Sequence, residues 1–431
     1  MNARFERALR AIFTERRITL YPLLTFGVLV CVAAYDRLFG NGLENAFGGG
    51  VGGDFLAFYT GGHFVAHGAA AQLYDADAQL AFQQRVVGAE LESVARWVSP
   101  PYVAWLFAPL GLMPYLWALA TWTAVSLAGV WLSFRALGRD LGLSQSPSRL
   151  LFIALQYYPA LQWVLNGQAT GLWLVLLVNS FVLLRRSKDV AAGLLLGCFA
   201  LKPPLALGVA IALLAAGRFR ALAAAALSAG ALVALGFVTL PQAMVEYVRR
   251  GPELVNLVRS DGYATAGLHG SFELATLLLD GISPPLAVLV GTLLMLAVLA
   301  WIFVSWRRAA WAPATLAWDL RMASTLTAGV IASPHLFIYD LTLLLLPLCV
   351  LLARSSPGHP PLDGWPRLPL VALVWALGLV GPALTLLQQV VSRRLLGFPL
   401  AIQLGAVVIL ATAVVLAREA DSSGSGSLTD R

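Results

Sequence analysis

Charged side chains are scarce in this 431-residue sequence, of which only 12% is Asp, Glu, Lys or Arg. An average soluble domain has about 25% charged and roughly 45–50% apolar residues, whereas 59% of this chain is apolar. This composition excludes a soluble globular protein. The apolar residues occur in blocks of about twenty, the length that crosses about 30 Å of hydrocarbon. We therefore predict a polytopic integral membrane protein.

The alternation of polar and apolar residues that is typical of membrane β-barrel strands is also missing. Lipid offers no hydrogen bonds to the backbone, so a span that is not part of a barrel must be a helix. The sequence therefore predicts an all-α membrane protein. Clear examples of apolar blocks are Ile18–Tyr35, Leu116–Phe134, Phe219–Leu240 and Leu286–Val304.

Cysteine is rare, and no cleavage signal follows the first apolar block. Cys31, Cys198 and Cys349 all lie inside apolar blocks, so we interpret them as small core residues rather than as a disulfide framework. The first block is long and is not followed directly by an Ala-x-Ala-like site, which predicts a retained first span. The net charge of +7 comes from arginines at span ends, a topology signal. It does not indicate a nucleic-acid partner.

The arginines predict which face of the membrane each loop occupies. Arg4, Arg7, Arg10, Arg16 and Arg17 place the N-terminus in the cytoplasm. Residues 37–98 then form a long first extracytoplasmic loop, and residues 241–285 form a second one. The other basic clusters expected inside are Arg135 with Arg139, Arg185–Arg186 with Lys188, Arg218 with Arg220, Arg307–Arg308, and the tail from Arg418.

Two proline-containing stretches have too much apolar chain for one membrane span and too little for two full spans. Ser99–Arg135 and Val190–Gly217 each fit a broken or re-entrant pair of half-helices, and with this reading the basic clusters fall inside. Broken helices at membrane depth are tolerated where they are buried or line a cavity. The count is about ten full spans plus two proline-broken hairpins. Only Arg393–Arg394 falls outside, which leaves the orientation of the last two spans open.

The spans form one predicted transmembrane domain, residues 1–420. No internal repeat is evident. The Ser- and Gly-rich segment Asp421–Arg431 is predicted to be a disordered cytoplasmic tail.

Asp54 begins the segment Asp-Phe-Leu-Ala-Phe-Tyr-Thr-Gly-Gly-His in the first outer loop. Phe55, Phe58, Tyr59 and Gly62 share one face of a helix, which predicts a helix lying at the membrane surface. Asp54 is either the N-cap of this helix or a general base at the mouth of a membrane site. The two roles are compatible.

Three weaker motifs favour structural roles. The glycine run at residues 48–53 matches a dinucleotide-binding pattern, but it follows a membrane span rather than a strand. Asp75 and Asp77 resemble a metal-binding pair, although a helix start fits them better. His63 and His67 share a helix face but lack an obvious third ligand. We predict no cofactor and no metal site.

Lys202, His335 and Asp340 lie where apolar blocks meet polar turns. A charge within a membrane segment is costly and by default suggests function. Lys202 either extends to the interface or pairs with an anion, most simply a lipid phosphate. For His335 and Asp340 the alternative is a buried, hydrogen-bonded structural role.

At these residues the sequence resembles glycosyltransferase family 87, membrane enzymes of the GT-C class. The resemblance runs from about Asp54 to Leu346. Its segments, in order, are Gly53–Tyr59, Leu73–Asp75, Ser99–Tyr102, Ala108–Pro114, Asn166–Gln168, Ala200–Pro203, Ser333–His335 and Tyr339–Leu341. The chain departs from the pattern at Ser99-Pro100-Pro101, where the aromatic residue Tyr102 follows the prolines rather than preceding them.

The resemblance implies a GT-C-type fold and a polyprenyl-phosphate sugar donor. It also implies that Asp54 is the catalytic base and that His335 lies near the donor phosphate. Lys202 is expected to bind the same phosphate, while Tyr59, Tyr102, Gln168 and Asp340 are expected to line the substrate groove. Mannose is the most expected sugar and arabinofuranose the alternative. The acceptor would be a glycolipid or glycan.

The residues fit this chemistry without the resemblance. Sugar transfer to a hydroxyl needs a base for its proton and positive charge where the phosphate leaves. Asp54 could supply the base, and Lys202 and His335 the positive charge. A single displacement inverts the anomeric centre. The Ala, Leu and Arg usage indicates a bacterium, so we expect the inner membrane and a site that faces the periplasm. The alternatives are a secondary transporter or lipid flippase, for which the missing repeat is unfavourable, and a glycan polymerase or ligase.

Overall fold

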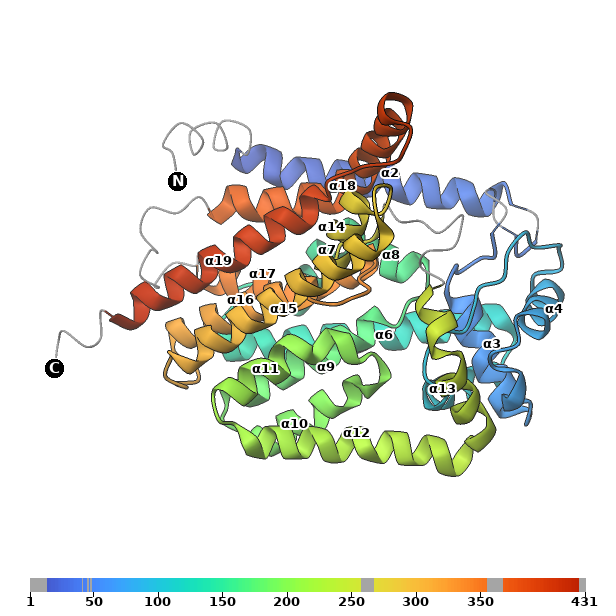
Figure 1. Ribbon diagram of the computed structural model, residues 1–431, viewed down its shortest axis with the longest axis horizontal. Helices are drawn as coiled ribbons and strands as arrows, with labels where there is room; N and C mark the ends of the chain where they lie inside the picture. Colours follow the sequence, from blue (N-terminus) through green and yellow to red (C-terminus); the bar gives the residue numbers. More distant parts are fainter. Residues whose placement is uncertain are drawn as a thin grey trace.

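The computed structural model describes residues 14–40, 42–44, 46, 49–256, 267–354 and 367–425. Regular structure in these ranges is helical, and β-pairing is limited to two isolated bridges. The predicted all-α class is therefore confirmed for the described part of the chain (Figure 1).

Five helices in the described ranges are long and apolar enough to cross a membrane. They are α2 (Glu15–Leu38), α6 (Tyr115–Leu141), α12 (Phe219–Thr239), α15 (Pro284–Arg307) and α18 (Arg367–Leu396). Shorter apolar helices accompany them, so the multi-pass character is supported, whereas the count of ten full spans stays a prediction. The remaining helices include α7 (Pro147–Leu155), α8 (Tyr158–Leu165), α9 (Thr170–Arg185), α16 (Leu316–Ile331), α17 (Leu345–Arg354) and α19 (Leu404–Ser425).

The chain is broken at Lys202-Pro203-Pro204, where the sequence predicts a break. Helix α10 (Asp189–Gly197) ends in a 3-10 turn, η4 (Cys198–Leu201), and a second turn, η5 (Pro203–Ala206), leads into α11 (Leu207–Ala215). Proline lacks an N–H and disfavours helical geometry in the residue before it. Lys202 accordingly has φ −150° and ψ 73°, which turns its side chain out of the helical path.

The other predicted broken pair differs from the structure. Residues 101–112 form only short turns and the four-residue α5 (Ala104–Phe107), but the chain then continues as the uninterrupted 27-residue α6. Pro114 is the N-cap of α6, a position outside the helical hydrogen bonding. The prediction of two half-helices is therefore wrong for this stretch.

The helix after Asp54 exists, but it is not a surface helix. Helix α3 (Phe55–Ala66) buries nine of its twelve residues. A Cβ at Gly61 would lie 2.3 Å from the Trp97 ring, and one at Gly62 would lie 2.3 Å from the Phe107 carbonyl oxygen. Protein therefore packs on several sides of α3, and the expectation of a single apolar face was wrong.

Helices α3, α4 (Ala76–Val87) and α13 (Pro241–Asn256), which belong to the two predicted outer loops, lie at the right of Figure 1. The second loop consists of α13 and α14 (Ser271–Leu279), with residues 257–266 outside the described ranges. Helix α19 extends to Ser425, so the first residues of the predicted disordered tail are helical. Residues 426–431 lie outside the described ranges.

Glycines allow helices to approach each other closely in the bundle, as is common in membranes. Cβ atoms at Gly193 and Gly197 of α10 would lie within 2.3 Å of carbonyl oxygens of α12. Helices α11 and α16 cross at Gly208 and Gly329, where a Cβ on Gly208 would lie 2.7 Å from the Gly329 Cα. These crossings hold the broken α10–α11 segment against its neighbours.

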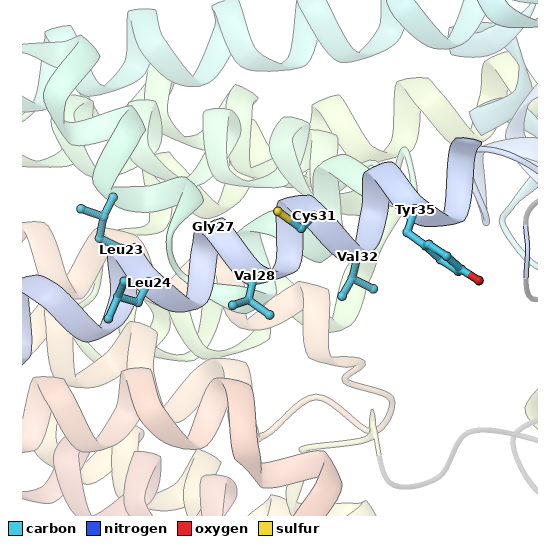
Figure 2. Close-up of a pocket in the computed structure, with 7 residues that line it drawn as sticks. All are labelled: Leu23, Leu24, Gly27, Val28, Cys31, Val32 and Tyr35. Atoms are coloured by element: carbon cyan, nitrogen blue, oxygen red, sulfur yellow. The ribbon is translucent and has the colours of Figure 1, made fainter. Parts of the chain in front are cut away.

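Helix α2 is the least enclosed long helix, and no residue of its apolar window is buried. An apolar groove of about 680 Å³ runs along it. Figure 2 shows the groove residues spaced along one helix, from Leu23 and Leu24 to Tyr35. This surface matches a helix that faces lipid.

Candidate functional site

Asp54 occupies the N-cap position of α3, but its side chain does not cap the helix. Its backbone is already helical, and it makes no side-chain cap hydrogen bond. The carboxylate instead accepts a hydrogen bond from Gln168 Nε2. The N-cap interpretation of the carboxylate is therefore wrong, and Asp54 and Gln168, both predicted site residues, are in contact.

The Asn166-Gly167-Gln168 turn fixes this contact. The Phe55 N–H donates to the Asn166 carbonyl over 3.0 Å, and Trp122 Nε1 donates to the Gly167 carbonyl over 2.9 Å. Gly167 has φ +55°, and a Cβ there would lie 2.6 Å from the Phe55 Cβ. Glycine is needed at such a close approach with positive φ, so the turn is shaped to meet the start of α3.

The glycines before Asp54 serve the same purpose. Gly52 and Gly53 have φ values of +87° and +52°, and a Cβ on Gly53 would lie 2.5 Å from Asn166 Oδ1. The part of the glycine run that the structure describes therefore bends the chain into the Asn166 turn. This role replaces the dinucleotide-binding pattern as the reason for these glycines.

The surroundings of Asp54 raise its pKa. The residue is exposed, yet enough protein surrounds it that desolvation raises the pKa above its usual 3.8. The Gln168 hydrogen bond and the charge of Lys202 act in the opposite direction, and the charge of Asp340 adds to the rise. A carboxylate with a raised pKa is a stronger base.

Lys202 pairs with a carboxylate of the protein. Its Nζ lies 2.7 Å from both Oδ1 and Oδ2 of Asp340, whose side chain is wholly buried at the start of η8 (Ile338–Leu344). Asp340 also accepts from Thr170 Oγ1 over 3.4 Å and from the Phe337 N–H over 3.3 Å. Of the readings left open, an anion partner is present in the form of Asp340, while binding of a lipid phosphate by Lys202 stays a prediction.

His335 lies on the turn between α16 and η8 and is partly exposed. Burial, reinforced by the charge of Lys202, lowers the pKa of His335 to about 4, although Asp340 opposes this shift. The imidazole is therefore neutral near pH 7. His335 can donate an N–H to an anion, but it does not supply the positive charge that the sequence led us to expect.

Five predicted site residues thus converge from four distant segments. Asp54 feels the charges of Lys202 and Asp340, and His335 feels the same two charges. The set contains a base, an ammonium group and a neutral imidazole. Its members are Asp54, Gln168, Lys202, His335 and Asp340.

The two predicted groove tyrosines, Tyr59 and Tyr102, are mostly buried, and their place in a substrate groove stays a prediction. The Tyr59 hydroxyl donates to the Met113 carbonyl over 2.8 Å, and the Tyr102 hydroxyl donates to the Ala200 carbonyl over 2.8 Å. Tyr102 thereby braces the turn just before Lys202. Tyr59 borders a cavity of about 440 Å³ that Tyr115 and Trp117 also line.

The candidate metal pairs have structural roles. The rings of His63 and His67 stack with centroids 3.9 Å apart, and His63 Nδ1 lies 3.1 Å from the Gly111 carbonyl oxygen. Asp75 caps α4 by accepting from the Asp77 and Ala78 N–H groups. Across the described ranges, no three His, Cys, Asp or Glu side chains gather in a way that could hold a metal.

Thr170 and Trp122 were missed by the sequence reasoning. Thr170 donates to Asp340, and Trp122 holds the Gly167 carbonyl. Thr170 follows the Asn166-Gly167-Gln168 turn by two residues, a position that could have indicated a role. Trp122 is one aromatic residue among many in an apolar helix and gives no such signal.

A family model for glycosyltransferase family 87 matches residues 97–334, more than half of the chain. The match includes Gln168 and Lys202, and it ends one residue before His335. No curated protein and no solved structure matches the chain.

Proposed function

The chain belongs to glycosyltransferase family 87, and on that premise we propose that it moves a sugar from a polyprenyl-phosphate donor to an acceptor hydroxyl. Mannose is the most expected sugar, and arabinofuranose is the alternative. The acceptor is a glycolipid or glycan on the extracytoplasmic side. The membrane helices agree with a lipid-linked donor that enters from the bilayer.

One observation carries the proposal, namely that Asp54 and His335 both feel the charges of the same Lys202–Asp340 ion pair. A base and a group of donors for a leaving phosphate must flank the same anomeric carbon. The segments that bring them together are the first outer loop, the α10–α11 break and the turn after α16. A purely structural ion pair would not need an exposed carboxylate next to it.

The reaction is a single displacement. The acceptor hydroxyl gives its proton to the Asp54 carboxylate, and its oxygen forms a bond to the anomeric carbon. The bond between this carbon and the phosphate oxygen breaks, and the phosphate leaves with the electron pair. The configuration of the sugar is therefore inverted, and no enzyme nucleophile is required.

Each residue has a separate part in this step. Gln168 orients the Asp54 carboxylate through its hydrogen bond. Lys202 has three N–H donors, and the two oxygens of Asp340 engage two of them, so one can meet the phosphate. His335 adds a neutral N–H donor. Preorganised donors of this kind stabilise charge that develops in the transition state.

The basic residues support an outward-facing site. Gln168 lies just before the N-terminus of α9, and Arg185 lies at the opposite end of that helix. Lys202 likewise lies between α10 and α11, whereas the ion pair of Asp189 with Arg218 lies at their far ends. Positive charge at a helix end favours the cytoplasm. This arrangement supports the proposal that the site faces the periplasm from a bacterial inner membrane.

Sugar transfer by the purified protein in detergent tests the proposal. Polyprenyl-phosphate mannose and a crude lipid acceptor fraction would be supplied to the wild type and to Asp54→Asn. The matched control is Asp77→Asn, which changes an exposed carboxylate in the same outer loop. We expect Asp54→Asn to lose transfer by roughly 10²- to 10⁴-fold, and Asp77→Asn to keep it.

Other results would change the assignment. Transfer that survives in Asp54→Asn would keep the enzyme class and remove Asp54 as the base. Transfer only from the arabinofuranose donor would change the sugar. If the wild type uses neither donor, while liposomes containing it move lipid or solute, a transporter or flippase replaces the proposal.

A further inference from the structure

Glu273 is a buried carboxyl group that the proposed reaction does not use. It lies in the first turn of α14 and is only 3% exposed. A buried acid is costly unless it is neutral or well hydrogen-bonded. Its position next to the turn that bears His335 suggests what it does.

The residues before α14 pair directly with the His335 turn. The His269 N–H donates to the Leu336 carbonyl over 2.9 Å, and Leu268 and Phe337 form an antiparallel bridge. A Cβ on Gly267 would lie 2.8 Å from the Phe337 ring. The second outer loop is thus joined to the turn on both sides of Leu336.

The Glu273 carboxyl group lies at this junction. Backbone groups of Gly270, Leu336 and Glu273 itself oppose the rise of its pKa, which places them close to the carboxyl group. A Cβ on Gly270 would lie 2.0 Å from Glu273 Oε2 and 2.6 Å from the Ser333 carbonyl oxygen. The carboxyl group and Ser333 therefore converge on one backbone position where only glycine fits.

Ser333 extends the contact to His335. Its Oγ donates to the His335 carbonyl over 3.1 Å, and Ser333 is fully buried. The Glu273 carboxyl group thus lies close to Leu336 and, across Gly270, to the Ser333 carbonyl group. The imidazole itself stays partly exposed on the turn.

The neutral acid suits this junction better than the carboxylate. Burial raises the pKa of Glu273 to about 8, so the group is protonated near pH 7. A carboxylic acid offers one O–H donor as well as acceptors, which matches a carbonyl and several N–H groups. An ionised carboxylate would repel the Ser333 carbonyl oxygen.

The charged groups next to the turn are Lys202 and Asp340, which pair with each other, and Asp340 also accepts from the Phe337 N–H. The two neighbouring histidines are uncharged near pH 7. Burial lowers the pKa of His269 to about 4, and that of His335 is also about 4. Helix α15 contributes Gly291 beside Phe272. The uncharged Gln403, just before α19, lies near His269 and accepts a hydrogen bond from Thr385 of α18. The ionisation of Glu273 is thus the change of charge beside the turn that a pH series follows.

We propose that Glu273 is a positioning residue that holds the Ser333–Phe337 turn, so that His335 faces the leaving phosphate. This rests on the proposed function, because it takes His335 as a donor to that phosphate. Glu273 does not touch the substrate. It acts through the backbone of the turn.

Two variants separate positioning from simple loss of packing. Glu273→Gln keeps the size, the donor and the acceptor of the neutral acid but cannot ionise. Glu273→Ala removes all of them. Glu92→Gln, on the exposed surface of the first outer loop, is the matched control. Transfer rates across pH and hydrogen exchange of the amides of residues 333–337 would be measured for each protein.

We expect the transfer rate of the wild type to fall above about pH 8, where Glu273 ionises. The amides of residues 333–337 should also exchange hydrogen faster in this range. Glu273→Gln should match the wild type near pH 7 and lack the alkaline loss. Glu273→Ala should lose roughly 10- to 100-fold in kcat at every pH and exchange the turn fastest. Glu92→Gln should follow the wild type throughout.

An alkaline loss that is equal in Glu273→Gln and the wild type would overturn the proposal. The proposal would also be overturned if the amides of residues 333–337 exchanged hydrogen at the same rate in all variants. If Glu273→Ala does not fold, the comparison of Glu273→Gln with the wild type decides alone. A wild type that transfers no sugar would defeat the proposed function, whereas the exchange data would still decide whether Glu273 holds the turn.

Discussion

Helix α9 has a group of charges at each end, and the two groups are built differently. At its C-terminus, Arg185 bonds to Asp140 over 2.8 Å and to Asp319 over 2.9 Å, and Arg186 bonds to Asp140 over 2.8 Å. At its N-terminus, Thr170 bonds to Asp340, which pairs with Lys202. About 24 Å of helix separates the ends.

The charge balance differs between these ends. Two guanidinium groups meet two carboxylates in the Arg185 network, whereas the Lys202 end has Asp54 and Asp340 for one ammonium group. The planar fork of arginine suits fixed two-sided pairing, while lysine is a compact charge with rotatable donors. We infer that the first end maintains the fold and that the second is left able to react.

The largest effect is expected from breaking the ion pair at the reactive end. Lys202→Met leaves Asp340 buried without its partner, which should lower the free energy of unfolding by about 3–5 kcal/mol. Transfer should fall by roughly 10²- to 10³-fold. Thermal unfolding and transfer assays in detergent measure both. The double variant Lys202→Met/Asp340→Asn should regain stability without activity, and recovered transfer would make the pair purely structural.

Breaking the other end should affect stability alone. Arg185→Met removes the arginine that bonds to both Asp319 and Asp140 and should also cost about 3–5 kcal/mol in unfolding free energy. Below its melting temperature the variant should transfer sugar at the wild-type rate per folded molecule. A reduced kcat in the folded variant would contradict the division between the two ends.

The pH dependence of the transfer rate should report the ionisation of the Asp54 carboxyl group. Because the pKa of Asp54 is raised and the base must be ionised, the rate should fall about tenfold per unit of pH below a pKa that exceeds the usual 3.8. Gln168→Leu removes a hydrogen bond that lowers this pKa, so the acid limb should move to higher pH. Arg185→Met is the control, and its acid limb should match that of the wild type.

The smallest effect is expected at Thr170, whose bond to Asp340 is long at 3.4 Å. Thr170→Val should cost about 0.5–1.5 kcal/mol in unfolding free energy and change transfer only a few-fold. The melting temperature and kcat would be measured together. A loss as large as that of Lys202→Met would show that Thr170, rather than the ammonium group, sets the position of Asp340.

The sequence was informative where a charge or a proline interrupts apolar chain. Lys202, Asp54 and His335 stood out for this reason, and the break at Lys202-Pro203-Pro204 is present. The continuous α6 was missed because Pro114 fits just before a helix as well as within a break. Proline alone does not distinguish these cases.

Long-range pairing was beyond the reach of the sequence. Glu273 looks like an ordinary acidic residue in the first turn of a helix, and only its burial against the His335 turn gives it another role. The burial of α3 was missed because its partners, Trp97 and Phe107, come from separate segments. Local periodicity reports one helix face and not what surrounds the helix.

The crossing of α11 and α16 at Gly208 and Gly329 has a consequence for how this chain can vary. Gly208 follows Lys202 by six positions, and Gly329 precedes His335 by six. A side chain at either glycine would separate the helices close to these two residues. A larger residue at this crossing is therefore expected to displace Lys202 and His335 as well as to weaken the packing of the two helices.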